Sequence, residues 1–337
     1  MKSTNMPYLV IGDVNLDIIM QADQFPAEGG EVVTDTTTFR LGGSGCNTAV
    51  CLAKFGFPTD LVAGMGFDPF GKVVTERLER SGIHERFILR EKNYQTGFFL
   101  IVITPSGERT MFGDRGSNLT PPPAEKIRPI LPDIQAIHIS GYSLIDPAQN
   151  KAIHQILKDS QPYQPCVSVD PGYFTMQRAR ERIHNVLPYL DFLLLSEDEL
   201  QLWDSNRSLE LNIEDLFSSG VKNIILKRGK AGSDWFSREE HYHQDAYQHP
   251  DIPIYDTTGA GDCYNAGFFF GYHNQLSPRD CLGLGNLNAF IAITSTKGVD
   301  YILSCNDMLS EMQTLLGKVG DIKTKEILQN LRDTALD

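Results

Sequence analysis

Short, continuously apolar runs alternate with longer amphipathic segments along most of the chain. A continuous apolar run is typical of a strand that is buried on both faces of a sheet. Such runs predict strands at residues 7–12, 134–140, 166–170, 191–196 and 223–226. The segments between them predict helices at residues 147–160 and 177–187 and after residue 196. Strands that alternate with helices form parallel sheets with right-handed crossovers, so the pattern predicts an α/β fold with a mostly parallel sheet.

Two segments, residues 16–39 and 87–114, depart from this pattern. They consist of short β-type runs separated by polar turns, and neither shows helical spacing. They predict a small β-sheet inserted into the α/β body. Residues 98–103 are apolar on both faces, so one face of this sheet must cover a ligand or a second subunit. Since we find no internal repeat and no low-complexity linker, residues 1–337 are predicted to form a single domain.

The sequence DTTGAGDCYNAGFFFGY, residues 256–272, has small residues that lead into an apolar run. It predicts a tight loop feeding the N-terminus of a buried helix. The first N–H groups of a helix lack internal partners and, with the helix dipole, form a site for a phosphate. Gly259, Ala260 and Gly261 would let an anion approach the main chain, and Asp262 would lie beside it as a base. The alternative is an ordinary core helix with Asp262 in its first turn.

This segment resembles, position for position, the C-terminal signature of the PfkB (ribokinase-like) family of carbohydrate kinases. Residues 42–56, GGSGCNTAVCLAKFG, followed by Gly66, resemble the family's N-terminal signature. The resemblance covers nearly the whole chain. It implies a ribokinase-like, three-layer, doubly wound α/β fold with the small β-sheet as a lid over the sugar. It also implies ATP and Mg²⁺ as cofactors, Asp262 as the general base, and a homodimer formed through the lid.

Polar side chains follow the first predicted strand, at the edge where α/β sheets bind ligands. Asp13, Asn15 and Asp17 lie there and offer donors and acceptors suited to sugar hydroxyls. The resemblance places Asn15 and Asp17 against the sugar, whereas the alternative is a turn held by Asx hydrogen bonds. The stretch lacks the G-x-G-x-x-G fingerprint, which argues against a dinucleotide-binding oxidoreductase.

The glycines at the start of residues 42–56 predict a loop-to-helix turn that touches a ligand. The resemblance places Gly42, Gly43 and Asn47 against the sugar, and the alternative is a closely packed turn. The usual ribokinase pattern has a lysine where this chain has Ser44. That departure weakens the case for ribose itself as the substrate.

Arg115 is a candidate for binding an anionic, carboxylate-bearing substrate, and the alternative is an arginine on a solvated loop. In kinases of 2-keto-3-deoxygluconate an arginine lies in a comparable place, and a second arginine follows a later strand. This chain has Phe174 where the second arginine is expected. A keto-deoxy sugar acid is therefore less favoured as a substrate than a neutral sugar.

Residues 226–233, LKRGKAGS, resemble the family's nucleotide loop, which implies that Lys227, Gly229 and Gly232 lie near the phosphates of ATP. The competing interpretation is a β-turn with exposed lysines. The loop is not a Walker A motif, because G-x-x-x-x-G-K-[ST] is absent from the chain. The resemblance also places Asn288 beside the adenine.

The family carries N-x-x-E at the end of a strand, where the pattern helps to place Mg²⁺ and the phosphates. This chain has Ser196-x-x-Glu199, so the resemblance implies that Glu199 binds Mg²⁺ through a water molecule. A hydroxyl at Ser196 can still hydrogen-bond a metal-bound water. The alternative is a helix start whose first turn is acidic for electrostatic reasons.

Two further segments carry candidate ligands for metal ions. By resemblance, Asp256 and Ser295, together with Gly298, are candidates for a K⁺ site. Residues 241–249 hold three histidines, but they lack an HExxH motif or a partner pair of cysteines. No metal site is predicted there.

The composition narrows the classes of partner. The chain of 337 residues has a net charge of −13 and a pI near 5.1, which argues against binding to nucleic acid or to anionic membranes. No apolar run approaches the ~18 residues that span a bilayer, and the apolar segment near the N-terminus is too short for a secretion signal. Six scattered cysteines without a C-x-x-C pair are typical of a reduced protein, so we expect a cytoplasmic location.

The function that these patterns favour is ATP-dependent phosphorylation of a primary hydroxyl of a small sugar, ribose-like or ketohexose-like. Asp262 would take the proton from the hydroxyl, and the main chain of Gly259, Ala260 and Gly261 would stabilise the developing charge. Two alternatives stay open: a nucleoside or 2-keto-3-deoxygluconate kinase, and a catalytically silent homologue that only binds a sugar.

Overall fold

The computed structural model describes residues 6–34, 36–106, 109–248 and 251–295. They form two compact units. Unit 1 comprises the described parts of Met1–Met6, Thr48–Pro58 and Leu187–Asp337, and unit 2 comprises those of Pro7–Asn47 and Thr59–Val186. The sequence predicts that residues 1–337 form a single domain. That prediction is about the way in which the two units combine, and it stays a prediction.

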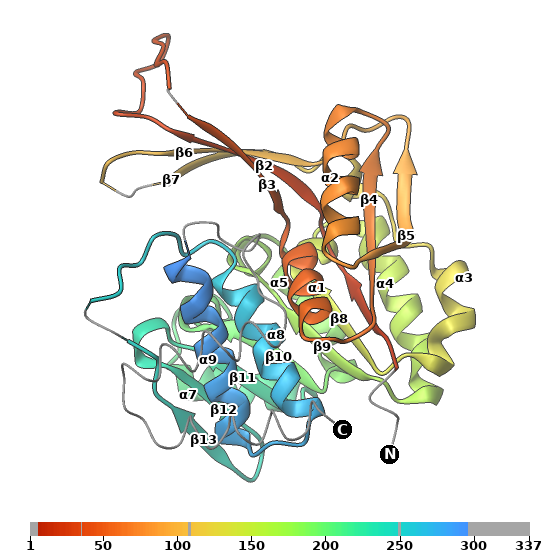
Figure 1. Cartoon of the computed structure of the whole chain (residues 1–337). Coiled ribbons are helices and arrows are strands. Elements are labelled where there is room, and N and C mark those ends of the chain that lie inside the picture. The colour runs from red at the N-terminus through yellow and green to blue at the C-terminus, as the bar shows by residue number, and fades with distance from the viewer. Residues whose placement is uncertain (1–5, 35, 107–108, 249–250, 296–337) are drawn as a thin grey trace. The chain divides into compact units, whose positions relative to one another are not determined.

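Unit 2 contains a parallel sheet with the strand order β9–β8–β1–β4–β5 (Figure 1). Its strands are β1 (Tyr8–Ile11), β4 (Thr59–Gly66), β5 (His84–Glu91), β8 (Ala136–Ser140) and β9 (Cys166–Asp170). The helices of this unit are α2 (Pro69–Arg80), α3 (Ala124–Ile127), α4 (Pro147–Ser160) and α5 (Tyr173–Val186). Every residue of β1 is buried between its two neighbours, as the continuous apolar run predicts. The parallel strands expected in this part of the chain are therefore confirmed.

Unit 2 also contains a smaller sheet with the order β3–β2–β6–β7, seen at the top of Figure 1. Its strands are β2 (Asn15–Gln21), β3 (Thr37–Gly42), β6 (Phe98–Ile103) and β7 (Arg109–Asp114). β2 and β6 run parallel, and the other two pairs are antiparallel. The prediction that residues 87–114 belong to this sheet was wrong for their first part. Residues 87–91 lie in β5, which pairs with β4, because Phe87 and Ile88 are both buried in the main parallel sheet.

Unit 1 contains the strands β10 (Phe192–Ser196), β11 (Asn223–Lys227), β12 (Ser233–Phe236) and β13 (His241–Gln244). β10 and β11 are parallel, whereas β12 and β13 form an antiparallel hairpin beside them. The helices are α6 (Glu197–Gln201), α7 (Leu209–Ser218), α8 (Ala260–His273) and α9 (Pro278–Thr294), and α1 (Ser44–Lys54) has all but its first turn in this unit. None of the helices in the described ranges combines the length and the hydropathy needed to cross a bilayer.

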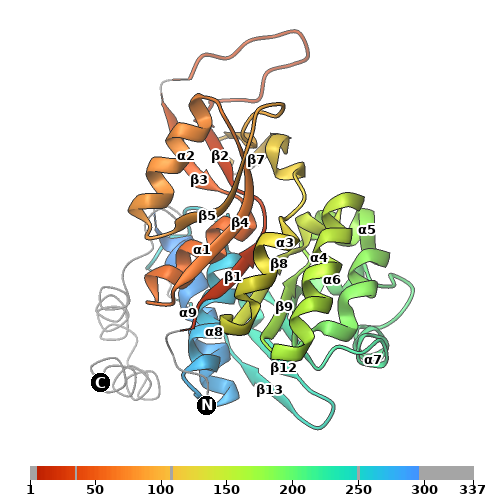
Figure 2. The same ribbon diagram turned by 90° about the vertical axis from the view of Figure 1, so that its right-hand side faces the viewer.

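Helices α8 and α9 lie side by side in both views (Figures 1 and 2). Small residues allow this close approach. A Cβ atom on Gly267 would lie 2.6 Å from the carbonyl oxygen of Leu284, and one on Gly285 would lie 2.8 Å from the ring of Tyr264. Because real Cβ atoms do not approach that closely, a larger residue at either position would push the two helices apart.

Aromatic rings fix the other face of α8. Phe268 and Phe269 are buried against Phe192 of β10, with ring centroids 5.4 and 5.8 Å apart in edge-on arrangements. Trp235 of β12 lies 5.3 Å from Phe268. Burying one such side chain contributes about 1.5–3 kcal/mol, and an edge-to-face pair adds about 0.5–1.5 kcal/mol. The helix is therefore held in one rotational setting.

His273 in the last turn of α8 makes the stability of unit 1 depend on pH. Its ring packs against Phe57, 6.1 Å away, and against Tyr272, and burial lowers its pKa from 6.5 to about 4. Between these values the unfolded chain binds a proton that the folded chain rejects. Stability is therefore complete above pH 6.5 and falls as the pH drops toward 4, by up to about 3 kcal/mol.

We expect the His273→Leu variant to lose most of this dependence. Denaturant unfolding at pH 7 and pH 5 would measure it for the variant and for the wild type. His184→Leu, at an exposed position of α5, is the control and should retain the full dependence. An undiminished drop in stability at pH 5 for His273→Leu would contradict this assignment.

Candidate active site

The residues singled out in the sequence fall into two groups, one in each unit. In unit 1, five of them line a cavity of about 590 Å³: Lys227, Gly229, Gly232, Ala260 and Gly261. Its walls are the loop after β11, residues 246–248 after β13, residues 252–257, the first turns of α8 and one face of α9. A cavity of this size, mostly apolar with a few polar groups, is typical of a small-molecule site.

The start of α8 forms part of the cavity wall. Gly259 is the N-cap residue and adopts a left-handed backbone conformation with φ of 75°, which glycine tolerates without strain. Ala260 and Gly261 line the cavity, and Asp262 follows in the first turn, where its side chain is largely buried. The predicted loop leading into a buried helix is therefore found. That Asp262 acts as a base stays a prediction.

Two lysines line the cavity. Lys227 ends β11, and its Nζ atom lies 3.4 Å from Oδ1 of Asn265 on α8. Lys230 lies in the following loop, and Gly229 and Gly232 on either side of it both have positive φ. A Cβ on Gly232 would lie 2.1 Å from the carbonyl oxygen of Gln244, so the loop packs tightly on β13. The loop thus packs on β13 and lines the cavity. Lys230 is exposed and Lys227 is half-buried, as the turn interpretation expects in part, and contact of this loop with ATP stays a prediction.

Other parts of the lining are apolar. They include Ile252 and Ile254 from the segment before α8, and Phe290 and Ile293 from α9. The cavity therefore offers positive charge and helix N–H groups as well as apolar surface. This combination suits a ligand that has an anionic part and a flat apolar part.

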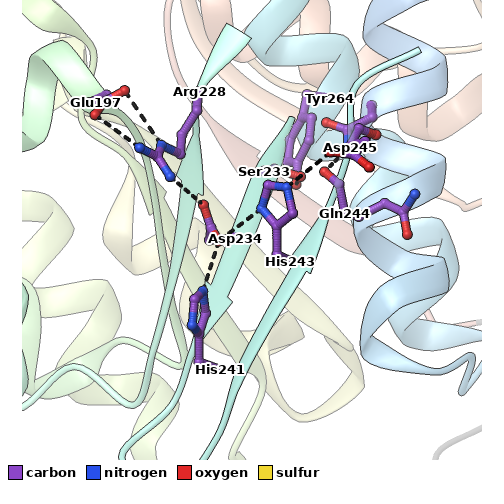
Figure 3. Close-up of polar contacts among 10 residues, drawn as sticks. Glu197, Arg228, Ser233, Asp234, His241, His243, Gln244, Asp245 and Tyr264 are labelled. Atoms are coloured by element: carbon purple, nitrogen blue, oxygen red, sulfur yellow. Dashed lines mark hydrogen bonds and ion pairs between the residues drawn. The ribbon is translucent and has the colours of Figure 1, made fainter. Parts of the chain in front are cut away.

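Hydrogen bonds hold this wall in place (Figure 3). The hydroxyl of Tyr264 on α8 bonds Oγ of Ser233 at 2.8 Å, and burial raises the pKa of Tyr264 well above its usual value. The side-chain amide of Asn286 on α9 donates to the carbonyl oxygens of Gln244 and Asp245, at 3.1 and 3.2 Å. These bonds fix the chain immediately before residues 246–248. Asn286 thus both lines the cavity and anchors its wall.

The family resemblance places Asn288, and not Asn286, beside the adenine. Asn288 is buried, and its amide donates to the carbonyl oxygen of Cys263 at 2.5 Å, which ties α9 to α8. It does not belong to the cavity lining, whereas Asn286 does. The two asparagines stand two residues apart in a mostly apolar helix, and no feature of the pattern separates them.

The histidines of the β12–β13 hairpin gather around a buried carboxylate (Figure 3). His241 and His243 both bond Oδ1 of Asp234, at 2.8 and 3.0 Å. The guanidinium of Arg228 lies between Asp234 and Glu197, at 3.5 and 3.4 Å. Within the described ranges, no three His, Cys, Asp or Glu side chains are grouped so that they could hold a metal ion. Here the histidines are hydrogen-bond partners of a buried acid. The third histidine of residues 241–249, His249, lies outside the described residues.

Ser196 and Glu199 form a capping box at the start of α6. The hydroxyl of Ser196 accepts from the N–H of Glu199 at 3.2 Å, and the carboxylate of Glu199 accepts from the N–H of Ser196 at 2.8 Å. This arrangement satisfies two N–H groups that the helix leaves without partners. It corresponds to the helix-start alternative, and contact of Glu199 with Mg²⁺ stays a prediction.

The residues proposed for K⁺ lie where the loop before α8 meets the end of α9. The N–H groups of Tyr255 and Asp256 donate to the carbonyl oxygen of Ile293, at 2.8 and 3.3 Å. The carboxylate of Asp256 accepts from the N–H of Thr258 at 2.9 Å. Ser295 is the C-cap residue of α9. Gly298 lies outside the described residues, and K⁺ binding stays a prediction.

In unit 2, two glycines pack against the polar residues that follow β1. A Cβ on Gly42 would lie 2.3 Å from the carboxyl atoms of Asp17, and one on Gly43 would lie 2.3 Å from the carbonyl oxygen of Asp13. Asn47, in the first turn of α1, donates its N–H to the carbonyl of Gly43. The structure therefore agrees with the interpretation of these glycines as part of a closely packed turn. The same packing brings these polar residues together.

Asn118 is a residue of this group that the sequence analysis missed. Its amide exchanges hydrogen bonds with the main chain of Val14, at 2.9 and 3.0 Å, and donates to Oδ1 of Asn15 at 2.7 Å. Because Oδ1 of Asn15 accepts this hydrogen bond, the NH₂ group of Asn15 points away from Asn118. The two partners are more than a hundred residues apart in the chain, so no local pattern could reveal the contact.

Arg115 lies neither on a solvated loop nor alone. Its guanidinium grips the carboxylate of Asp13 with two hydrogen bonds, Nε to Oδ2 at 3.1 Å and Nη2 to Oδ1 at 2.9 Å. Both side chains are largely buried. The sequence suggested Arg115 as the cation that binds a substrate carboxylate. In the structure its guanidinium is instead bound to Asp13 of the same unit.

Residues 8–302 match the family model described as pfkB family carbohydrate kinase. The chain belongs to this family. Its members transfer the phosphoryl group of ATP to an alcohol group of a carbohydrate, so the chain is an ATP-dependent carbohydrate kinase. The expectation drawn from the two sequence signatures is confirmed.

Relatives of known name agree with this assignment. The chain is 26% identical over 284 residues to a ribokinase of Arabidopsis thaliana, covering 82% of this chain and 73% of the plant protein. It is 27% identical over 269 residues to a 2-dehydro-3-deoxygluconokinase of Haemophilus influenzae, covering 75% and 85%. The solved structure of the Arabidopsis ribokinase with ribose and ATP superposes with a TM-score of 0.75 at 22% identity, over 91% of this chain and 98% of that one. The predicted ribokinase-like fold is confirmed.

The role of Asn286 can be tested by substitution. Asn286→Ala removes both hydrogen bonds to the chain that precedes residues 246–248, so we expect the affinity for ATP to fall about tenfold, or ~1.4 kcal/mol. Calorimetric titration with a non-hydrolysable ATP analogue would measure the change.

The matched control for Asn286 is Asn274→Ala. It removes a comparable amide-to-carbonyl bond, from Asn274 to Phe270 at 2.7 Å, at the far end of α8. This variant should bind the analogue as the wild type does. Equal losses of affinity in the two variants would show that Asn286 contributes only general stability.

Proposed function

We propose that the protein transfers the γ-phosphoryl group of ATP to a primary hydroxyl of a small neutral sugar, ribose-like or ketohexose-like. The observation that carries the proposal is the cavity of unit 1, which two lysines and the first residues of α8 line, with Asp262 as the next residue of the helix. The polar residues after β1 in unit 2 would bind the sugar.

The nucleotide would lie with its base against Phe290 and Ile293 and with its phosphates toward Lys227 and Lys230. The volume of about 590 Å³ and a lining that holds both apolar side chains and two lysines fit such a ligand. The N–H groups of Gly259, Ala260 and Gly261 would stabilise the charge of the transferred group. Bound Mg²⁺ would neutralise part of the phosphate charge, and Glu199 is the candidate for holding its water.

Asp262 is proposed to accept the proton of the sugar hydroxyl. The hydroxyl oxygen then forms a bond to the γ-phosphorus as the bond to the bridging oxygen of ADP breaks. General-base help of this kind contributes about 10²–10⁴-fold. The position of Asp262 in the first turn of α8 supports the role, because the carboxylate follows directly after the residues that line the cavity.

The sugar would be held by Asp13, Asn15 and Asp17, with Asn47 at the start of α1. Carboxylates accept hydrogen bonds from hydroxyls, and the NH₂ group of Asn15 can donate one. The name and the bound ribose of the Arabidopsis relative support a pentose, whereas the Haemophilus relative is named for a sugar acid. Nucleosides and 2-keto-3-deoxygluconate are the alternative substrates.

A second copy of the chain is proposed to cover the small sheet. Phe39 on β3 and Phe112 on β7 are exposed, and the register Phe39–Ile18–Leu100–Phe112 puts them on the same face of the sheet. Large apolar side chains exposed on one face are typical of an interaction site. This supports the homodimer expected through the lid. K⁺ between Asp256 and Ser295 and a cytoplasmic location are proposed on the family resemblance and the composition alone.

Asp262→Asn tests the mechanism. The amide cannot take up a proton, so we expect kcat to fall at least about a hundredfold while sugar and ATP still bind. Coupled ADP-release assays would measure turnover, and calorimetry would measure binding. A panel of pentoses, ketohexoses, keto-deoxy acids and nucleosides would identify the preferred acceptor.

Asp280→Asn provides the matched control for this test. Asp280 is the third residue of α9, as Asp262 is the third residue of α8. Both changes remove an acid from the first turn of a helix, so they share any effect on helix stability. We expect Asp280→Asn to retain turnover. Near wild-type kcat in Asp262→Asn would refute the proposed mechanism.

A further inference from the structure

The pair formed by Asp13 and Arg115 is the feature of unit 2 that the proposed mechanism does not explain. The guanidinium meets the carboxylate through Nε and Nη2, at 3.1 and 2.9 Å, so both carboxylate oxygens are engaged. The exposed fraction of the side chain is 6% for Asp13 and 18% for Arg115. A bidentate pair of this kind has a fixed orientation as well as strong attraction.

Arg115 is also held from a second side. Its Nη2 atom lies 3.4 Å from Oε1 of Gln149 on α4. The amide of Gln149 donates in turn to the carbonyl oxygens of Asn118 and Thr120, at 2.5 and 3.3 Å. Arg115 is therefore anchored by two elements and does not swing on a loose loop.

The charged residues that the chain brings near this pair include two acids, Asp17 and Asp114, and one cation, Arg40. Asp17 lies two strand positions beyond Asn15, opposite Arg40 in the pairing of β2 with β3. Asp114, next to Arg115, accepts a hydrogen bond from the N–H of Gly116. Burial raises the pKa of Asp13 above its ordinary value, and the neighbouring guanidinium opposes that rise. Arg115 thus supplies the positive charge that a buried Asp13 requires.

Neutral and acidic sugars would meet this pair differently. A hydroxyl can donate to the remaining lone pairs of the Asp13 carboxylate and leave the ion pair intact. A ligand carboxylate would have to displace Asp13 from Arg115, which would leave a buried acid without its cation, or else lie among acids of the same charge. Both outcomes are unfavourable.

We propose that Arg115 is a positioning residue for Asp13, and that the ion pair makes this kinase select uncharged polyols over sugar acids. The inference rests on the proposed sugar-kinase function and narrows its substrate class. In this role Arg115 does not bind a carboxylate of the substrate. It holds Asp13, which in turn binds the substrate.

The test compares two kinds of acceptor in wild type and variants. The neutral probes are ribose and fructose, and the acidic probes are gluconate and 2-keto-3-deoxygluconate. The quantity measured is the ratio of kcat/KM for an acid to kcat/KM for a neutral sugar. Because both values come from one preparation, a partly unfolded variant does not change this ratio. In the wild type we expect a ratio below about one tenth.

Asp13→Asn removes the charge that occupies Arg115, so the ratio should rise at least about tenfold. Arg115→Gln removes the cation, so KM for the neutral sugar should rise about tenfold with no gain for the acid. Arg115→Lys should recover part of the neutral-sugar affinity, since it restores the charge without the bidentate grip.

The matched control is Asp60→Asn. Asp60 is a buried acid of the same unit and pairs with Arg86. It lies near the start of β4, beside Leu9 of the parallel strand β1, whereas Asp13 follows the end of β1. The change therefore breaks a similar ion pair at the opposite edge of the sheet. The ratio should stay at its wild-type value.

The outcomes separate this inference from the proposed function. A wild-type preference for acids, or an unchanged ratio in Asp13→Asn, would overturn the inference while leaving a kinase. Absence of ATP consumption with every probe would refute the proposed function instead. In that event, calorimetric affinities of ribose and gluconate for wild type and Asp13→Asn would decide the role of the pair by the same ratio.

Discussion

The close approach of α8 and α9 is the constraint on which the cavity of unit 1 depends. Gly267 and Gly285 leave no room for a Cβ atom, so the two helices pack backbone against side chain. The start of α8 forms one wall of the cavity and α9 forms another. Any residue that separated the helices would also change the width of the cavity. The glycines of α8 and α9 are therefore as much a part of the site as the residues that line it.

Buried acids impose a second constraint in this acidic chain. Asp13 in unit 2 and Asp234 in unit 1 are both buried, and each is neutralised within its own unit. Their cationic partners, Arg115 and Arg228, lie in loops next to the residues proposed to bind ligands. An acid removed from water without a partner would be strongly destabilising. These arginines are therefore needed to stabilise the folded state. The cations that line the cavity are lysines of the loop after β11.

Much of the fold could be predicted because its signals are local. Apolar runs marked the parallel strands, and the segment before α8 carried the turn, the small residues and the acid within a few positions of one another. Residues 87–91 were misassigned because β5 carries charges at both of its ends, HERFILRE, and only the tertiary structure shows that its centre is buried. A periodicity argument cannot separate a mixed strand of this kind from a strand of the small sheet.

The contacts that organise the candidate site were less accessible to sequence reasoning. Asn118 and Arg115 contact Asn15 and Asp13 across more than a hundred residues, and Asn286 contacts the main chain of Gln244 across 42 residues that include α8. Each is a single polar side chain whose partner is set by the fold. Sequence patterns identified which residues could carry chemistry, whereas the structure shows which of them are already paired.

The departure at Ser196 can be separated into an effect on stability and an effect on chemistry. Asparagine and serine are about equally good N-cap residues, so a serine at this position costs α6 little, and the capping box with Glu199 is formed. What the replacement removes is the NH₂ donor of the asparagine side chain, since a hydroxyl offers one proton where the amide offers two. The capping bond engages Oε2 of Glu199. Serine in place of asparagine should therefore change which groups this side chain can hydrogen-bond, and not the folding of the helix.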